Sequence, residues 1–329
     1  MRRSQFLLAT GAALGCLPRM ARAGACSEDS GASIRVLLGR GMANRMDDCS
    51  FSFGTRTYRG TFASTADGEI VNTIPLEEYL YGVVPMEVPH SWPQATLQSQ
   101  AILSRTFALA RTNPARYYDV VASQGDQAYG GLDAEHPETS AAVSATGGQV
   151  LTFDGDQATV AYMSCCGGHT ESAAEAWIGG SSAPYLRGVV CAYCADAPDF
   201  QWQRDIPLGS ARNAFSDLWS IANEDLRSVQ IMSADPSGRA RTIRFSSSAG
   251  GFEVSGREFR RRLGAVAVRS LLIHSIQVDA AAASLTIEGS GRGHGVGLCQ
   301  WGARALGAAG HRVPDILNFY FPGTALRNG

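Results

Sequence analysis

The sequence predicts an α+β fold in which mixed antiparallel strands surround a central helical pair. The chain of 329 residues is 45% hydrophobic and 18% charged, a composition typical of a globular protein with a large core. Strand-like and helical segments are grouped along the chain instead of alternating regularly, which favours α+β over a doubly wound parallel sheet. Residues 75–111 combine helical spacing with prolines, so they predict two helices joined by a short loop.

Residues 1–23 have the pattern of a signal peptide. Arg2-Arg3 form a basic start, Phe6 to Leu17 an apolar stretch, and Ala21-Arg22-Ala23 a small-x-small cleavage site. We therefore expect an exported protein of the periplasm or cell envelope, translocated by the Sec or the twin-arginine route, with a lipoprotein signal at Cys16 as the alternative. No apolar run in the remainder is long enough for a membrane helix.

The charge pattern argues against several classes of function. Loss of the signal peptide removes four arginines and no acidic residue, which changes the formal charge from −2 to −6. An acidic exported protein without a basic tract is a poor candidate for nucleic-acid binding. All 28 basic residues are arginine. A pyridoxal Schiff base, a Walker-type phosphate site and a Ser-Lys dyad are excluded, because each needs a lysine.

Beyond the signal peptide, residues 24–33 are rich in Ser and Gly and are expected to be flexible. No linker forces a division of residues 34–329, which are predicted to form one domain. Strands with alternating apolar and polar residues are predicted at Val229–Ser233, Arg241–Phe245 and Phe252–Val254. Further strand-like segments lie at Ile34–Leu38, Thr57–Ala63, Ile70–Asn72, Gln149–Phe153, Thr159–Met163, Ile273–Val278 and Leu285–Glu288. Helices are predicted at Glu138–Ala145, Leu208–Ala222 and Ser255–Leu263, and two short helices end the chain. The Arg260–Arg262 run is expected to form a solvated face.

The boundaries of the two central helices follow from prolines and caps. The first helix is predicted to run from Leu76 to Val83, because Pro85 disfavours a helical conformation at the residue before it. Ser91 and Gln94 form an S-x-x-Q capping box, so the second helix is predicted to start at Trp92.

One carboxylate, Glu87, lies between the two predicted helices among apolar residues and prolines. Rigid apolar surroundings raise the pKa of a carboxylic acid, as a general acid at neutral pH requires. The alternative is a buried helix pair in which Glu87 only caps a backbone group. On the second helix, Gln94, Gln98, Ala101 and Arg105 share one face, and this polar face suits a groove better than a core.

The cysteines suggest a metal site. A C-x-x-C pair follows two adjacent cysteines and a histidine, and this set can supply tetrahedral zinc ligands: Cys165, Cys166, His169, Cys191 and Cys194. Neighbouring residues on an extended backbone point to opposite sides, so only one of the adjacent pair is expected to bind. Disulfides are the alternative, because an exported protein meets an oxidising compartment. Cys26 and Cys49 are candidates for a further disulfide, and His136 is a spare ligand candidate.

Two further clusters contain polar residues that suit a sugar. The Gly291–Gly297 block fits no nucleotide-binding fingerprint, and its glycines predict a tight backbone path that brings Arg292 and His294 to a groove. Gln127 and Tyr129, near Asp126, offer an amide and an aromatic face. The alternatives are a glycine-rich turn with a satisfied histidine for the first cluster, and an ordinary turn for the second.

These motifs together resemble the stage II sporulation protein D and amidase-enhancer (SpoIID/LytB) family. The matching residues are Leu76–Leu80, Gly82–Val84, Glu87, Pro89, Trp92, Gln100-Ala101, Arg105-Thr106, Tyr58-Arg59-Gly60, Gln127-x-Tyr129-x-Gly131, Gly167-Gly168-x-Thr170 and Gly291–Gly297. They occur in the family's order and span roughly residues 34 to 325. The chain departs from the family pattern where cysteines replace serines, at Cys165, Cys166 and Cys299. We interpret Cys299 as a small buried substitute and not as a nucleophile.

The resemblance implies a SpoIID-like peptidoglycan-active domain with lytic transglycosylase activity. Glu87 would protonate the glycosidic oxygen between N-acetylmuramic acid and N-acetylglucosamine, and then assist attack by the C6 hydroxyl to give a 1,6-anhydro end. Substrate contacts are assigned mostly by resemblance, to Gln98, Arg105, Gln127, Tyr129, Arg292 and His294. A bound zinc would be structural, since Cys-rich sites leave no open position.

Two other functions remain open at this stage. Relatives described as enhancers of cell-wall amidases imply a non-catalytic alternative, in which the chain binds glycan strands and activates an amidase partner. A zinc amidase that acts on the stem peptide through the Cys/His cluster is a third hypothesis. It is disfavoured because catalytic zinc prefers His and carboxylate ligands with one position left to water.

Overall fold

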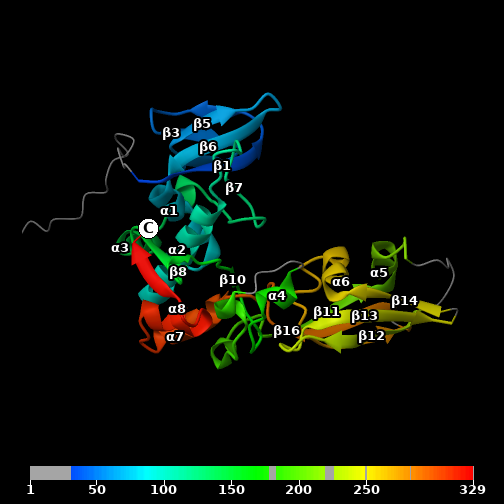
Figure 1. Ribbon diagram of the computed structural model, residues 1–329. Coiled ribbons are helices and arrows are strands. Elements are labelled where there is room, and N and C mark those ends of the chain that lie inside the picture. The colour runs from blue at the N-terminus through cyan, green and yellow to red at the C-terminus, as the bar shows by residue number, and fades with distance from the viewer. Residues whose placement is uncertain (1–30, 178–182, 219–225, 249, 282, 329) are drawn as a thin grey trace, which may run out of the picture.

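The computed structural model describes residues 31–177, 183–218, 226–248, 250–281 and 283–328 (Figure 1). Helices and strands are grouped along the chain instead of alternating regularly, and most strand pairs are antiparallel. The predicted α+β class is therefore confirmed. The expected signal peptide and Cys26 lie outside the described residues. None of the described helices is both long and apolar enough to span a membrane.

The N-terminal part consists of two small sheets. The larger sheet has the order β5-β6-β1-β7, where β1 (Ser33–Arg40) pairs antiparallel with β6 (Glu69–Pro75) and parallel with β7 (Val120–Val121). Its edge strand is β5 (Thr61–Ser64). The smaller sheet contains β2 (Ala43–Arg45), β3 (Ser50–Phe53) and β4 (Arg56–Arg59). Apolar side chains from these strands pack on the central helices.

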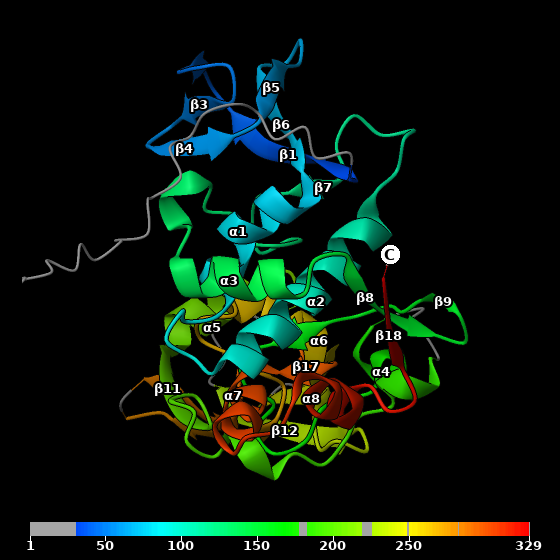
Figure 2. The ribbon, with the colours of Figure 1, turned by 90° about the vertical axis from the view of Figure 1, so that its left-hand side faces the viewer.

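The central helices are α1 (Leu76–Glu87) and α2 (Gln94–Arg111), and α3 (Pro137–Ala145) packs against both. Figure 2 shows these three helices between the N-terminal sheet and the C-terminal helices. Helix α2 is buried on two sides, because Leu97 and Ala101 join the N-terminal core while Ile102 and Leu103 join the next one. The predicted central helical pair is therefore present, and α2 links two cores.

Two boundaries of this pair differ from the prediction. Helix α1 does not stop before Pro85 but continues through it to Glu87, and the Val88 amide donates to the Val84 carbonyl at 3.1 Å. Pro85 has no N–H to donate to the Tyr81 carbonyl, so α1 continues past it with one hydrogen bond of the ladder missing. Helix α2 begins at Gln94 with Pro93 at the N-cap, so the predicted capping box of Ser91 does not form.

A second core surrounds the C-terminal helices α7 (Gln300–Ala308) and α8 (Val313–Tyr320). Its sheet has the order β18-β8-β9. The remaining elements of this part are β8 (Gln149–Phe153), β9 (Asp156–Gln157), β18 (Ala325–Asn328), the parallel pair β10 (Tyr162–Met163) and β17 (Leu298–Cys299), α4 (Ala173–Ala176), and the 3-10 turns η2 (Pro184–Leu186) and η3 (Ala192–Cys194). A further 3-10 turn, η1 (Leu132–Ala134), packs instead on α1 and β4.

A third core forms a lobe that projects to one side of the molecule in Figure 1. Its two three-stranded sheets have the orders β11-β16-β15 and β12-β13-β14. The elements are β11 (Gln201–Pro207), β12 (Leu226–Ala234), β13 (Ala240–Ser247), β14 (Gly250–Ser255), β15 (Ile273–Asp279), β16 (Ser284–Ser290), α5 (Leu208–Ala214) and α6 (Gly256–Leu263). Buried Phe215, Phe245 and Phe259 contact one another at its centre.

Within the lobe, α5 is shorter than the helix predicted at Leu208–Ala222, whose last residues lie outside the described ranges. The helix ends at Ala214, and the side chain of the next residue, Phe215, fills the core. The predicted helix at Ser255–Leu263 is confirmed, and Ser255 caps it by accepting the Glu258 amide at 3.1 Å. The prediction that residues 34–329 form a single domain remains a prediction.

Candidate functional site

Glu87 lies in the last turn of α1, where it is half-buried. One of its carboxylate oxygens, Oε1, accepts the backbone N–H of Ala128 at 3.2 Å. Burial raises the pKa of Glu87, while the Ala128 amide and the Tyr162 hydroxyl oppose this rise by bonding to the charged form. No charged side chain of the described residues is among the causes of the shift. The site is thus built around one carboxylic acid with a raised pKa.

Tyr162 is the residue of this site that the sequence did not reveal. Its hydroxyl accepts the side-chain N–H of Gln127 at 3.0 Å and lies close enough to the Glu87 carboxylate to oppose the rise in its pKa. The Gln127 amide also donates to the Ser104 carbonyl at 3.3 Å and accepts the Tyr79 hydroxyl at 3.3 Å. These fixed partners orient the Tyr162 hydroxyl toward the carboxylate. In the sequence Tyr162 is only one apolar position in a predicted strand, so no local signal marks it.

The backbone of Tyr162 connects Glu87 to the glycine-rich block. His294 Nε2 lies 3.0 Å from the Tyr162 carbonyl oxygen, and His294 Nδ1 accepts the Val296 amide at 3.1 Å. Nε2 must therefore carry the proton of a neutral ring. Burial lowers the pKa of His294 to about 4, an effect that nearby Arg260 and Arg239 reinforce. Both ring nitrogens of His294 are occupied by these contacts, so it positions the Tyr162 segment.

The glycines of this block permit the approach. Gly297 has a φ of +75°, and a Cβ there would lie 2.1 Å from the Ala161 carbonyl oxygen. Only glycine allows the two segments to come this close. The parallel pairing of β10 with β17 that results places the Tyr162 segment beside the block.

Arg105 is buried and does not line a groove. Its guanidinium binds Glu77 with two hydrogen bonds, at 2.6 and 2.7 Å, and donates to the carbonyls of Gln149 and Val143 at 3.0 and 3.3 Å. The polar face predicted on the second helix thus packs on α3 and β8. We therefore correct the predicted substrate contact of Arg105 to a structural role.

The expected substrate contacts of Gln127 and Tyr129 also need correction, because both residues are buried. The Tyr129 hydroxyl donates to Asn72 Oδ1 at 3.2 Å, and its ring packs on Tyr58 and Tyr79, so it has no face free for a sugar. Burial also raises the pKa of its hydroxyl far above the usual value. Gln127 instead holds the Tyr162 hydroxyl in place by donating a hydrogen bond to it.

Two of the predicted contacts, Arg292 and Gln98, are not enclosed in this way. Arg292 has an exposed side chain that donates to Asp199 Oδ2 at 3.2 Å, and Arg269 binds the same carboxylate. Gln98 is half-buried on α2, one turn after Gln94, which donates to the Glu138 carbonyl of α3 at 3.3 Å.

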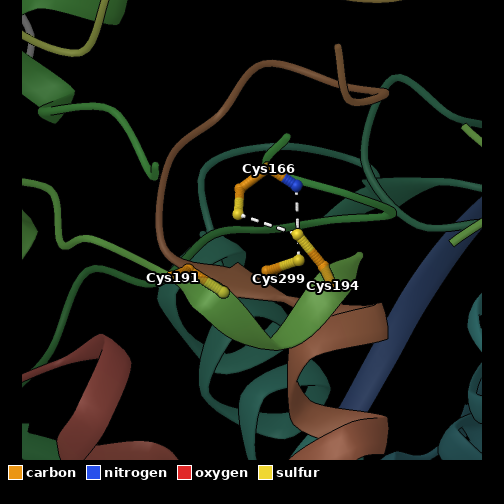
Figure 3. Close-up of side chains that lie close together, drawn as sticks. All are labelled: Cys166, Cys191, Cys194 and Cys299. Carbon is orange, nitrogen blue, oxygen red and sulfur yellow. Dashed lines mark hydrogen bonds between the residues drawn. The ribbon is translucent and has the colours of Figure 1, made fainter. Parts of the chain in front are cut away.

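Four buried cysteines form a cluster in which the sulfur atoms all lie within 4.8 Å of one another. Figure 3 shows the side chains of Cys166, Cys191, Cys194 and Cys299 directed toward a common centre. The Sγ atoms of Cys166 and Cys194 are 3.5 Å apart, and all four cysteines are free. Tetrahedral zinc with Zn–S bonds of about 2.3 Å would need sulfur atoms about 3.8 Å apart, so the cluster has the dimensions of such a site.

The backbone and one tyrosine supply an outer shell. Cys299 Sγ accepts the amides of Cys166 and Gly302 at 3.2 and 3.4 Å, and Cys191 Sγ lies 3.3 Å from the Tyr320 hydroxyl. N–H and O–H donors of this kind stabilise metal-bound thiolates. The cluster therefore fits a closed metal site with no position left for a substrate.

The ligand set differs from the predicted one. Cys299 is buried, as interpreted, but it also contributes the fourth sulfur of the cluster. His169 is not part of the cluster, because its Nδ1 lies 2.5 Å from the Thr170 carbonyl oxygen. Only one of the adjacent cysteines, Cys166, belongs to the group of four, while Cys165 Sγ lies 4.0 Å from the Cys194 carbonyl. The signal for this ligand set in the sequence was the replacement of the family's serines by cysteines at Cys165, Cys166 and Cys299.

Cys49 is disulfide-bonded, while Cys26, the partner predicted from sequence, lies outside the described residues. The spare ligand candidate His136 belongs to a second group of three side chains, together with His90 and Glu138. Its ring stacks on His90 with centroids 3.5 Å apart, and its Nδ1 pairs with Glu138.

Comparison of the sequence with known proteins assigns the chain to a family. The model for the SpoIID family, described as stage II sporulation protein, matches residues 64–153. The chain is 30% identical over 260 residues to an uncharacterized protein of Brachyspira hyodysenteriae, in an alignment covering 77% of this chain and 67% of that protein. The chain belongs to the SpoIID/LytB family. Glu87 and Ala128 lie within the segment that the SpoIID model matches, whereas Tyr162, His294 and the four cysteines lie outside it.

Two relatives with descriptive names support the same assignment. The amidase enhancer of Bacillus subtilis is 32% identical over 291 residues, an alignment that covers 75% of this chain but only 40% of the enhancer. The stage II sporulation protein D of Bacillus subtilis is 24% identical over 273 residues, with 78% of this chain and 75% of that protein covered.

Proposed function

We propose that this SpoIID/LytB protein has a cell-wall role and cleaves peptidoglycan glycan strands as a lytic transglycosylase. The observation that carries the proposal is the half-buried Glu87, a carboxylic acid whose pKa is raised by burial and whose carboxylate accepts the Ala128 amide at 3.2 Å. A glycosidase that uses water normally needs two carboxyl groups on opposite sides of the bond. Intramolecular attack by a substrate hydroxyl needs only one group that first donates and then accepts a proton.

In the first step, protonated Glu87 gives its proton to the glycosidic oxygen between N-acetylmuramic acid and N-acetylglucosamine. The C1–O bond breaks, and the N-acetylglucosamine side leaves as an alcohol. The carboxylate that remains is stabilised by the Ala128 amide and the Tyr162 hydroxyl, since both are donors. In the second step, this carboxylate takes the proton of the muramic C6 hydroxyl while O6 bonds to C1. The product ends in a 1,6-anhydro ring, and Glu87 is protonated again.

The experiment that tests this proposal is mass spectrometry of the products from purified glycan strands, with wild type and Glu87→Gln. Anhydro-muramic ends that vanish in the variant support the proposal. Reducing ends would mean that water is the nucleophile and that a second carboxyl group takes part.

A second candidate is favoured by the amidase enhancer among the relatives. The protein would then bind glycan strands without cutting them and would activate a cell-wall amidase. Glu87→Gln discriminates between the two, because a pure enhancer keeps its effect on an amidase when this carboxyl group is lost. Binding to strands without cleavage by either protein would favour the enhancer.

We further propose that the four-cysteine cluster binds one structural zinc ion. Cys166, Cys191, Cys194 and Cys299 would hold it, and the ion would stabilise the junction between η3 and the start of α7. Four thiolates leave no coordination site for a substrate, so zinc takes no part in the cleavage step. Metal analysis of purified protein tests this, with one zinc per chain expected and none contradicting it.

Export to the periplasm or cell envelope remains a proposal, supported by the signal-peptide pattern of residues 1–23. Sequencing of the mature N-terminus from a secreting host tests it: cleavage after Ala23 is expected, and an intact N-terminus in the cytoplasm would contradict it.

A further inference from the structure

A cleft of about 620 Å³ lies where the projecting lobe meets the rest of the protein. One wall contains Trp177 at the end of α4 and His294 of the glycine-rich block, and the other contains strand β13 and the first turn of α6. The Trp177 and His294 rings are 5.4 Å apart between centroids, and the tryptophan is partly exposed. Tyr162 connects this cleft to the Glu87 site, because its carbonyl contacts His294 and its hydroxyl acts on the pKa of Glu87.

Four arginines line this cleft, and they differ in their partners. Arg241 and Arg261 pair with Glu175 and Glu258, respectively. Arg257 and Arg260 have only backbone carbonyls as recorded partners within the described residues. Arg257 donates to the Ala176 carbonyl at 3.1 Å, and Arg260 donates to the carbonyls of Val268 and Arg269 at 2.9 and 3.2 Å. Two guanidinium charges thus line the cleft without a carboxylate partner in the part of the chain that the structure describes.

Arg260 is the more telling of the two, because its side chain is half-buried. Burial lowers the pKa of Arg260, as expected for a cation held in the protein without an anionic partner. The expectation that Arg260–Arg262 forms a solvated face is therefore wrong for Arg260. The positive end of α6, whose first turn lines the same cleft, acts in the same direction.

The acidic residues of the cleft do not cancel this charge. The pKa of Glu171 is raised to about 8 by burial and by its contact with Asp235, so Glu171 is mostly neutral at pH 7. Asp235 bonds to Ser237 and to the Arg239 amide, and buried Arg239 faces Glu171 at 3.5 Å. The proton on Glu171 and the positive charge of Arg239 thus balance the Glu171 and Asp235 carboxyl groups. The positive charges of Arg257 and Arg260 remain in excess.

We propose that this cleft is a carboxylate subsite for the glycan, with Arg260 and Arg257 as the anion-binding residues and Trp177 as a platform for the sugar. This inference rests on the proposed function, since it assumes that the strand bound at Glu87 continues into the cleft. Guanidinium groups match carboxylates with paired hydrogen bonds. The carboxylate has two sources in peptidoglycan: the lactyl group of a muramic acid without its peptide, or the acidic residues of an attached stem peptide.

The test measures binding with the Glu87→Gln protein, so that no turnover is required. Dissociation constants are determined for peptide-free muramic strands, for strands that carry stem peptides, and for N-acetylglucosamine oligomers, which have no carboxylate. These are compared in the Arg260→Gln and Arg257→Gln backgrounds. The control is Arg244→Gln, which changes a surface arginine of the same lobe that pairs with Glu253 at 3.8 Å.

We expect Arg260→Gln to weaken binding of a carboxylate-bearing strand about tenfold, or about 1.4 kcal/mol, and to leave the N-acetylglucosamine oligomer unchanged. Loss confined to peptide-free strands identifies the lactyl group as the ligand, and loss confined to peptide-bearing strands identifies the stem peptide. The exposed Arg257 side chain donates to one backbone carbonyl, that of Ala176. Arg257→Gln should therefore also weaken binding of a carboxylate-bearing strand, even if Arg260→Gln disturbs folding.

Equal affinities for all three ligands in both variants would overturn the subsite. So would an equal loss for the oligomer without carboxylates, because that result indicates a general structural effect. Failure of the transglycosylase proposal is seen separately, as absence of cleavage by the wild-type protein, and it leaves these binding comparisons valid.

Discussion

Replacing Glu77 by Gln tests the structural role that we assign to Arg105. The Arg105 side chain is 1% exposed and that of Glu77 is 26% exposed. The substitution keeps the shape of residue 77 but leaves the guanidinium buried without a charged partner. Breaking a buried ion pair from one side costs about 3–5 kcal/mol. The partial exposure of Glu77 and the two carbonyl partners that Arg105 retains place the expected loss near the lower end, at about 3 kcal/mol.

Urea denaturation followed by circular dichroism measures this loss in the free energy of unfolding. Glu77→Gln combined with Arg105→Met should be more stable than Glu77→Gln alone, because the double variant no longer buries a charge. Glu253→Gln, which breaks the exposed pair with Arg244, serves as the control and should cost less than about 1 kcal/mol. Glycan binding by the folded Glu77→Gln protein should be unchanged. Normal stability with lost glycan binding would refute the reasoning and restore the substrate contact of Arg105 predicted from sequence.

Further predictions concern the acid and the metal cluster. Tyr162→Phe removes a donor to the Glu87 carboxylate, so the pKa of Glu87 should rise further and the alkaline limb of the pH–kcat/KM profile should move to higher pH. An unmoved limb would contradict the hydrogen bond, and Tyr81→Phe, at an exposed hydroxyl, is the matched control. Cys194→Ser should abolish zinc binding and lower the thermal midpoint, whereas Cys165→Ser should retain the metal. Retention of zinc by Cys194→Ser would contradict the proposed ligand set.

The sequence predicted the fold class and most elements because their signals are local. Alternation of apolar and polar residues located β13, predicted at Arg241–Phe245, and α6 lies within the helix predicted at Ser255–Leu263. The strands β2, β3, β7, β9, β11, β17 and β18 were missed. Of these, β7, β17 and β18 are two to four residues long and exist only through pairing with distant segments, so no local pattern marks them. The end of α1 was predicted too early, since Pro85 does not terminate the helix.

The site shows the same division between local and distant information. The local sequence of Glu87, with its apolar and proline neighbours, predicted a raised pKa, and burial does raise it. The functions of its neighbours depend on distant partners. Arg105 was assigned to a groove because the polar face of its helix does not reveal its buried partner. That partner is Glu77, which lies 28 residues earlier in the chain. Cys299 was set apart from the other cysteines because 133 residues separate it from Cys166.

The central claim is that Glu87 alone moves both protons of a transglycosylation. Its most direct test is mass spectrometry of glycan fragments released in heavy-oxygen water by wild type and by Glu87→Gln. The account predicts that wild-type products are lighter by one water than hydrolytic fragments, carry no heavy oxygen, and are absent with Glu87→Gln. Reducing ends labelled with heavy oxygen, or anhydro ends formed equally well by Glu87→Gln, would contradict it.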